Sequence, residues 1–159
     1  MRSIAFLVVI GFMITACDDS RVYEKNYDFT ERYWLIAEKP SFDFTIRDTT
    51  LHFNLLCNIR NSVAYPYSRI FIHYSLQDSS KNELKNEMIT SFLFDEKTGK
   101  PLGSSGLGDI YDQQLGLLQN YKFNTPGTYS ITFEQFMRTD TLQGVLAVGV
   151  RVETSAEKK

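Results

Sequence analysis

Alternation of apolar and polar residues is the main pattern of the chain after residue 40. In SFDFTI (residues 41–46) every second residue is apolar, and LHFNLLCNIR (residues 51–60) alternates over ten positions, with only Leu56 breaking the rule. A period of two predicts a strand with one buried and one solvated face. The same phase places Cys57 on the buried face with Leu51, and a lone cysteine there usually packs as a small hydrophobe.

Further strand-like segments follow, separated by turn signals such as NTPG. They span residues 69–77, 88–94, 116–123, 128–136 and 144–153. No long segment shows a helical period, and the charged stretch before Met88 favours at most one helical turn around Leu84. About seven to nine short one-faced strands predict an all-β fold, in the form of an antiparallel β-sandwich.

The N-terminal residues have a different pattern. Arg2 precedes an uncharged apolar run from Ile4 to Ile14, about half the roughly 20 residues that a membrane-spanning helix needs. A cation, a short apolar run and small residues are typical of a secretory signal peptide. The box ITAC resembles a bacterial lipobox, in which the cysteine sulfur receives a diacylglycerol and cleavage frees the amine for a third acyl chain. We expect lipidation of Cys17; the alternative is a plain signal peptide with an incidental cysteine.

This interpretation divides the chain into four parts. We expect a lipoprotein signal peptide (1–16), an acylated cysteine and polar tether that begins to dock on the domain (17–33), a β-sandwich (34–153) and a polar tail (154–159). Two or three acyl chains such as palmitate anchor a protein stably, whereas one chain holds only marginally. The acids Asp18 and Asp19 are compatible with an inner-membrane retention mark or with a surface-export mark, so the membrane face stays open.

Composition limits the other classes of function. The chain has 17 lysines and arginines against 19 aspartates and glutamates, for a net charge of −2, and no basic stripe. Nucleic-acid binding therefore lacks its electrostatic basis. If Cys17 carries lipid, Cys57 is left without a disulfide partner. Stability must then come from packing, for which the sequence offers 12 Phe, 9 Tyr and 1 Trp.

Candidate catalytic chemistry is sparse, and no cofactor or metal site is predicted. His52 and His73 lie 21 positions apart on polar strand faces, without further zinc ligands at close spacing. The glycine-rich segment 103–109 is predicted to be a mobile inter-strand loop, since no helix N-terminus follows it to complete a phosphate site. Asp109 and Asp112 form the nearest carboxylate pair and support a hydrolase only if they share a cleft.

An aromatic pair at Tyr65-Pro66-Tyr67 offers a second function. Proline keeps the preceding residue extended, so both rings could be presented as a platform for a glycan. The alternative is a loop whose tyrosines pack back onto the sandwich. Tyr65 and Tyr67 are therefore the candidate ligand contacts.

Several segments, in their order and spacing, resemble the GldH-type gliding-motility lipoproteins of Bacteroidetes. The segments are ITAC, the early aromatic residues ending at Trp34, SFDFTIRDTT, NIRNSVAYPYSRIFIHY, KTGKPLGSSGLGDIYD, FNTPGTYSITFEQFMR and LQGVLAVGVRVE. The resemblance implies a lipid-anchored protein of the cell envelope, at the outer membrane, linked to motility or secretion machinery and without enzymatic activity. It carries over Cys17 alone as a functional residue. The leading hypothesis is a non-catalytic module that binds envelope proteins; the alternative is a glycan-binding surface lipoprotein.

Overall fold

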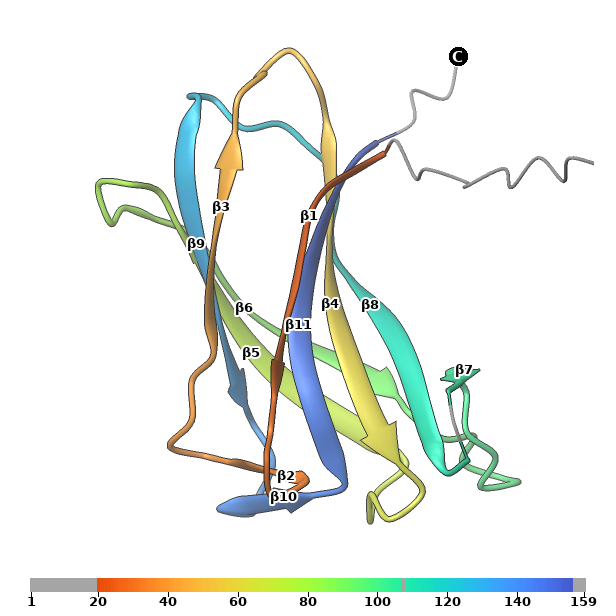
Figure 1. Cartoon of the computed structure of the whole chain (residues 1–159). Helices are drawn as coiled ribbons and strands as arrows, with labels where there is room; N and C mark the ends of the chain where they lie inside the picture. The colour runs from red at the N-terminus through yellow and green to blue at the C-terminus, as the bar shows by residue number, and fades with distance from the viewer. Residues whose placement is uncertain (1–19, 107, 156–159) are drawn as a thin grey trace, which may run out of the picture.

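The computed structural model describes residues 20–106 and 108–155, which form eleven β-strands in antiparallel sheets and no helix (Figure 1). The largest sheet has five strands in the order β1-β11-β4-β8-β7. Its strands are β1 (Arg21–Asp28), β11 (Val145–Thr154), β4 (Phe53–Ser62), β8 (Ile110–Tyr121) and β7 (Ser104–Ser105). We call it the β4 sheet.

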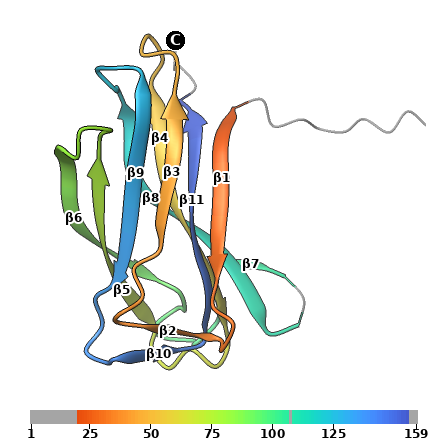
Figure 2. The same ribbon diagram turned by 60° about the vertical axis from the view of Figure 1, so that its left-hand side comes forward.

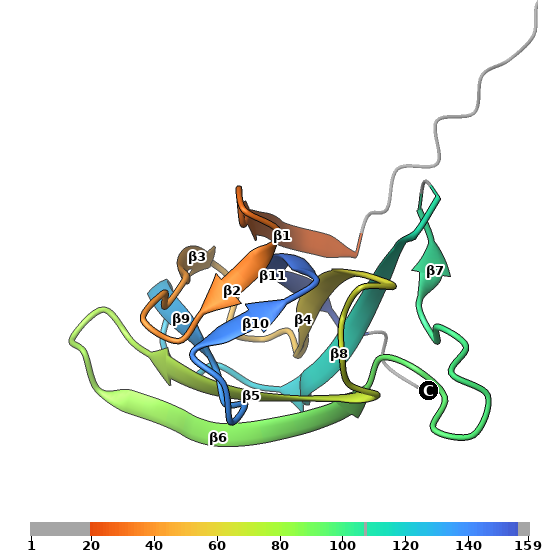
Figure 3. The same cartoon turned by 90° about the horizontal axis from the view of Figure 1, so that it is seen from below.

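The second large sheet has four strands in the order β3-β9-β5-β6, and we call it the β5 sheet. Its strands are β3 (Ser41–Ile46), β9 (Gly127–Gln135), β5 (Arg69–Gln77) and β6 (Glu83–Phe92). The two sheets lie face to face (Figure 2). A two-stranded ribbon of β2 (Tyr33–Leu35) and β10 (Thr141–Gln143) covers one end of the sandwich (Figure 3). The predicted antiparallel β-sandwich is confirmed.

The period-two pattern identifies the buried faces correctly in most strands. In β3, β5 and β9 buried and partly exposed residues alternate along the whole strand. In β4 the predicted apolar face is buried, including Cys57 with no exposed surface. The prediction fails at Leu51, which precedes β4 in a turn and is exposed.

Three segments are more regular than the sequence pattern indicated. Part of the expected tether is the edge strand β1, which pairs with β11, so the β4 sheet begins at Arg21. Leu84 lies in β6 rather than in a helical turn, because β6 begins at Glu83 and pairs with β5. The glycine-rich segment contains β7, paired with β8, so this part of it is held in the sheet. The described strands therefore outnumber the seven to nine expected.

A cluster of aromatic rings joins the two sheets at the end where β4 begins and β3 ends. Phe123 is 1% exposed, and its ring centroid lies 4.5 Å from that of Tyr129 and 5.7 Å from that of Phe53. The ring of Phe44 lies 6.0 Å away in an edge-on arrangement. Because Phe53 belongs to the β4 sheet whereas Phe44 and Tyr129 belong to the β5 sheet, Phe123 links both layers.

Trp34 fills the opposite end of the core, beneath the ribbon of β2 and β10. It has no exposed surface, and its ring stacks on Phe29 at 5.4 Å between centroids. Its indole Nε1 donates a hydrogen bond to the Glu38 carbonyl oxygen at 2.8 Å. A buried tryptophan needs such an acceptor for its polar N–H.

The β1 strand crosses the molecule from one end to the other along β11 (Figure 1). A Cβ atom at Gly149 of β11 would lie 2.5 Å from the Lys25 carbonyl oxygen and would collide with the Asn26 side chain. Glycine is therefore required for β1 to approach this closely. The backbone N–H of Thr154 donates to the Ser20 carbonyl oxygen at 2.8 Å, so the first and last described segments meet at the same end.

The aromatic cluster predicts a contrast between two phenylalanines. Phe123→Ala should lower the free energy of unfolding by about 3–5 kcal/mol, since it removes a buried ring and leaves a cavity. Phe136→Ala, at a side chain that is 61% exposed, should cost less than about 1 kcal/mol. Urea denaturation of the purified variants measures both values. Equal losses would contradict the role assigned to Phe123.

Candidate functional site

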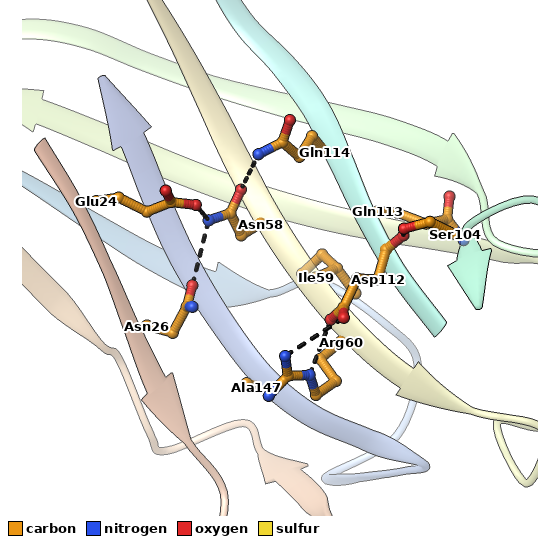
Figure 4. A pocket seen from close by; sticks show the side chains of 10 residues that line it. All are labelled: Glu24, Asn26, Asn58, Ile59, Arg60, Ser104, Asp112, Gln113, Gln114 and Ala147. Atoms are coloured by element: carbon orange, nitrogen blue, oxygen red, sulfur yellow. Dashed lines mark hydrogen bonds and ion pairs between the residues drawn. The ribbon is translucent and has the colours of Figure 1, made fainter. Parts of the chain in front are cut away.

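A polar cleft of about 350 Å³ lies on the outer face of the β4 sheet (Figure 4). It is lined by Glu24, Asn26, Asn58, Ile59, Arg60, Ser104, Asp112, Gln113, Gln114 and Ala147. These residues come from β1, β4, β7, β8 and β11. Alternation turns Asn58 and Arg60 of β4 outward, and Asp112 and Gln114 of β8 likewise. Gln113 has the opposite phase in β8 and donates to the Leu93 carbonyl oxygen.

The side chains of this cleft bind one another. Asn58 donates through Nδ2 to Glu24 Oε1 at 2.9 Å and to Asn26 Oδ1 at 3.3 Å. The Nε2 of Gln114 donates to Asn58 Oδ1 at 3.1 Å. A few positions along β4, Arg60 Nε donates to a carboxylate oxygen of Asp112 at 2.8 Å. Asn58 and its partners connect β1, β4 and β8 across the intervening strand β11, and the Arg60–Asp112 pair joins β4 to β8 separately.

Electrostatics favour the charged form of Glu24. Burial acts to raise the pKa of Glu24, but hydrogen bonds from Arg21 and Asn58 together with the charge of Arg151 outweigh it and lower the pKa. The hydrogen bond from Arg60 to Asp112 raises the pKa of Arg60. A carboxylate with a lowered pKa is a poor proton donor near neutral pH. Glu24 is therefore a paired carboxylate rather than a group tuned for acid–base chemistry.

The carboxylates considered for hydrolysis do not act as a pair. Asp112 binds Arg60 in the cleft, whereas Asp109 lies 3.8 Å from an Arg32 nitrogen and does not line that cleft. The reason is strand geometry: Asp109 precedes β8 and Asp112 lies within it. The shared cleft that the hydrolase hypothesis required is not formed by these two residues.

The histidines and the cysteine have separate environments. His52 borders a surface pocket beside Asn120. His73 lies in β5, in contact with the side-chain oxygen of Asn86. Burial raises the pKa of the Cys57 thiol, which disfavours the nucleophilic thiolate. Within residues 20–106 and 108–155, no three metal-ligating side chains gather into a group.

The two candidate tyrosines do not form a platform. Tyr65 is buried, its hydroxyl donates to the Arg69 carbonyl oxygen at 2.9 Å, and its ring stacks on Phe94 at 6.3 Å. Tyr67 is 44% exposed and packs edge-on against Tyr65. Tyr65 thus follows the alternative in which the loop packs back onto the sandwich, because its apolar ring fills the core beneath this loop.

An apolar groove of about 670 Å³ lies on the outer face of the β5 sheet, near the end covered by β2 and β10. It is lined by Ile36, Tyr67, Phe71, Met88, Gln135, Phe136, Met137 and Arg138. Ile36, Met88 and Phe136 are exposed large hydrophobic residues. The outward position of Phe71 follows from strand parity, since Ile70 and Ile72 are buried on the other face of β5.

A buried glutamine holds one wall of this groove. Gln135 is 2% exposed, and its Nε2 donates to the Thr139 carbonyl oxygen at 2.7 Å. Its Oε1 accepts the backbone N–H of Met137 at 2.8 Å. The backbone N–H of Phe136 donates to the Phe71 carbonyl oxygen at 2.9 Å. These bonds fix the turn that presents Phe136, so the groove is formed before any partner arrives.

Cys17 and the expected signal peptide lie outside the described residues. In the part of the chain that the structure describes, no helix is long and apolar enough to cross a membrane. The described domain is thus an antiparallel β-sandwich with a self-paired polar face and an apolar groove.

The chain belongs to the GldH lipoprotein family, whose model matches residues 21–152. It is 28% identical to a gliding motility lipoprotein GldH homolog of Christiangramia forsetii, over 98% of this chain and 99% of that protein. It is 23% identical to the gliding motility lipoprotein GldH of Flavobacterium johnsoniae, over 96% of this chain and 97% of the relative. The resemblance to this family drawn from the sequence segments is confirmed.

A solved structure of dimeric latent PorU from Porphyromonas gingivalis shows a distant likeness. The TM-score is 0.35 at 8% identity, over 86% of this chain and 13% of that one.

The polar network predicts a pH-dependent contribution from Glu24. Because its pKa is lower in the folded state, its ionised form stabilises the fold at neutral pH. That stabilisation disappears as the pH falls through the folded pKa. Glu24→Gln should therefore cost up to about 1 kcal/mol at pH 7, and the difference from the unaltered protein should shrink progressively below about pH 5.

Urea denaturation across this pH range makes the measurement. Glu31→Gln is the control, since Glu31 is exposed and makes no ion pair with another described residue. A Glu24→Gln cost that is the same at every pH would contradict an ionic origin.

Proposed function

We propose that this protein is a non-catalytic interaction module of the gliding-motility or secretion-linked machinery, held on the outer membrane by acyl chains on Cys17. The observation that carries the proposal is the apolar groove on the outer face of the β5 sheet. The family relationship supports a lipid-anchored envelope protein associated with gliding motility. The groove supplies the surface through which such a protein can act without catalysis.

The groove has the features of a protein-binding surface. Soluble domains rarely leave clustered large apolar side chains in water without a partner. Phe136 is 61% and Met88 is 54% exposed, yet the core is complete without them, since Trp34 and Phe123 close its two ends. Covering these side chains would contribute roughly 25 cal/mol per Å² of apolar surface removed from water.

The polar cleft is less suited to recruit a partner. Asn58, Arg60 and Gln114 already have hydrogen-bond partners in the same cleft. A ligand would have to replace those bonds, and exchange of one hydrogen bond for another gives little net free energy. The glycan alternative rested on Tyr65 and Tyr67 together, and Tyr65 is buried.

The lipid anchor gives the first test of this function. The native protein should begin at Cys17 and carry acyl chains, and Cys17→Ala should move it from the membrane fraction to the soluble envelope fraction. Mass spectrometry of the N-terminal peptide and membrane fractionation measure these outcomes. An intact Met1, or an unmodified sulfhydryl at Cys17 in the native material, would refute the anchor.

The groove gives the second test, with a matched control. The double variant Met88→Ser/Phe136→Ser removes two exposed apolar side chains inside the groove. Leu51→Ser/Leu102→Ser removes two exposed apolar side chains outside it. Both variants should fold and stay on the membrane, but only the groove variant should lose colony spreading, protein secretion or its co-purifying envelope proteins. If the two variants behave alike in all three assays, the groove is not the interaction surface.

A further inference from the structure

We propose that the apolar groove binds an extended segment of a partner protein that carries an aromatic or aliphatic anchor residue with a carboxylate close to it. The inference rests on the proposed function and defines the chemistry of the partner. The anchor would lie between Met88 of β6 and Phe136 beyond β9, over Phe71 of β5. The carboxylate would bind Arg138.

Arg138 is the only charged residue among those that line the groove. Its side chain is exposed, and it makes no ion pair or hydrogen bond with another residue in 20–106 or 108–155. Lys39, in contrast, is paired and lies 2.9 Å from a Glu134 oxygen. A groove whose one formal charge is positive and unpaired favours an acidic partner segment.

A second arginine lies along the same face. Arg69 and Phe71 share the outward parity of β5, and the Arg69 guanidinium carbon lies 4.1 Å from the Phe92 ring centroid. Arg69 forms an exposed ion pair with Glu96 at 3.7 Å, and exposed pairs of this length are weak. The apolar floor is thus bordered by cationic side chains, while the groove lining contains no acid.

The position of the groove argues against the lipid bilayer as its occupant. Two residues separate Cys17 from Ser20, so an anchored chain holds Ser20 within about 10 Å of the lipidated residue. The eight residues of β1 then run toward the opposite end of the sandwich (Figure 1), a length of about 26 Å. The groove lies near that opposite end, beside β2 and β10, and therefore far from the lipidated residue.

Charge argues against a second copy of this chain as the occupant. In a two-fold symmetric contact the same patch lies on both sides. The two Arg138 side chains would then approach each other across a groove that offers them no acidic residue. A partner segment that supplies its own carboxylate removes this repulsion.

The experiment selects peptides on the full-length acylated protein in nanodiscs. A library of random 12-residue peptides displayed on phage is panned on the unaltered protein, on Met88→Ser/Phe136→Ser and on Leu51→Ser/Leu102→Ser. We expect peptides with an aromatic or aliphatic residue next to Asp or Glu to be enriched on the unaltered protein and the control, and lost on the groove variant.

Synthetic versions of the enriched peptides then test the carboxylate. Arg138→Gln should weaken binding about two- to fivefold, the range for an exposed ion pair. Arg138→Glu should reverse the preference, so that the Asp→Lys version of each peptide binds this variant better than the Asp version. Lys39→Gln, a cation outside the groove, should leave the dissociation constants unchanged.

Different outcomes separate this inference from the proposed function. Peptides that need Met88 and Phe136 but bind Arg138→Glu as well as the unaltered protein would overturn the acidic partner and leave the interaction surface standing. Dimerisation that is lost in Met88→Ser/Phe136→Ser, or binding of the unacylated protein to lipid vesicles through the groove, would overturn a protein segment as occupant. If no peptide is enriched in a way that depends on the groove, the inference is overturned. If the two double variants behave alike in cells, the proposed function is refuted separately.

Discussion

Contact between aromatic rings across the two sheets is the constraint on which the structure depends. Cys57 is free and buried, so the described domain has no disulfide to hold its layers together. Phe123 meets rings from both sheets at one end, and Trp34 fills the core at the other. Each such pair adds about 0.5–1.5 kcal/mol to the burial of its apolar area. With both ends filled, the sheets keep a fixed separation, and the end that holds Ser20 stays opposite the end near which the groove lies.

Most of this fold could be predicted from the alternation of inward and outward side chains along each strand, because burial of one face imposes a period of two on the sequence. The exact span of β5 follows from that rule, whereas β4 is shifted by two residues from the predicted segment 51–60. β1 does not follow from it. All of its residues are exposed or intermediate, and its place is set by pairing with β11, more than 100 positions away. A local pattern cannot indicate an edge strand whose stability comes from a distant partner and from the space left at Gly149.

The sequence indicates which side chains of the groove are exposed but not that they lie together. Phe71 and Phe136 occupy the polar phase of their strands, next to residues such as His73 and Glu134, and an apolar residue in that phase is a signal of an exposed hydrophobic side chain. Their meeting depends on register, since Ile72 pairs with Gln135 and thereby brings the two phenylalanines to one place. At Tyr65 the sequence left two alternatives open, because a loop position shows no alternation and burial is decided by the fit against Phe94.

The two outer faces of the sandwich differ in how well their side chains are suited to contact with water. On the β4 sheet, Asn58 and Arg60 have their hydrogen-bonding capacity met by neighbouring strands, so water can cover this face at little cost. On the β5 sheet, water covers Met88 and Phe136, whose burial by a partner would release free energy. Gln135 lies inside and fixes the turn that exposes Phe136, which lowers the conformational entropy lost on binding. The hydrogen-bonding groups of the β4 sheet face are already paired, whereas the β5 sheet face leaves apolar side chains in water. Association therefore releases free energy at the β5 sheet face, and a partner must approach the domain from that side.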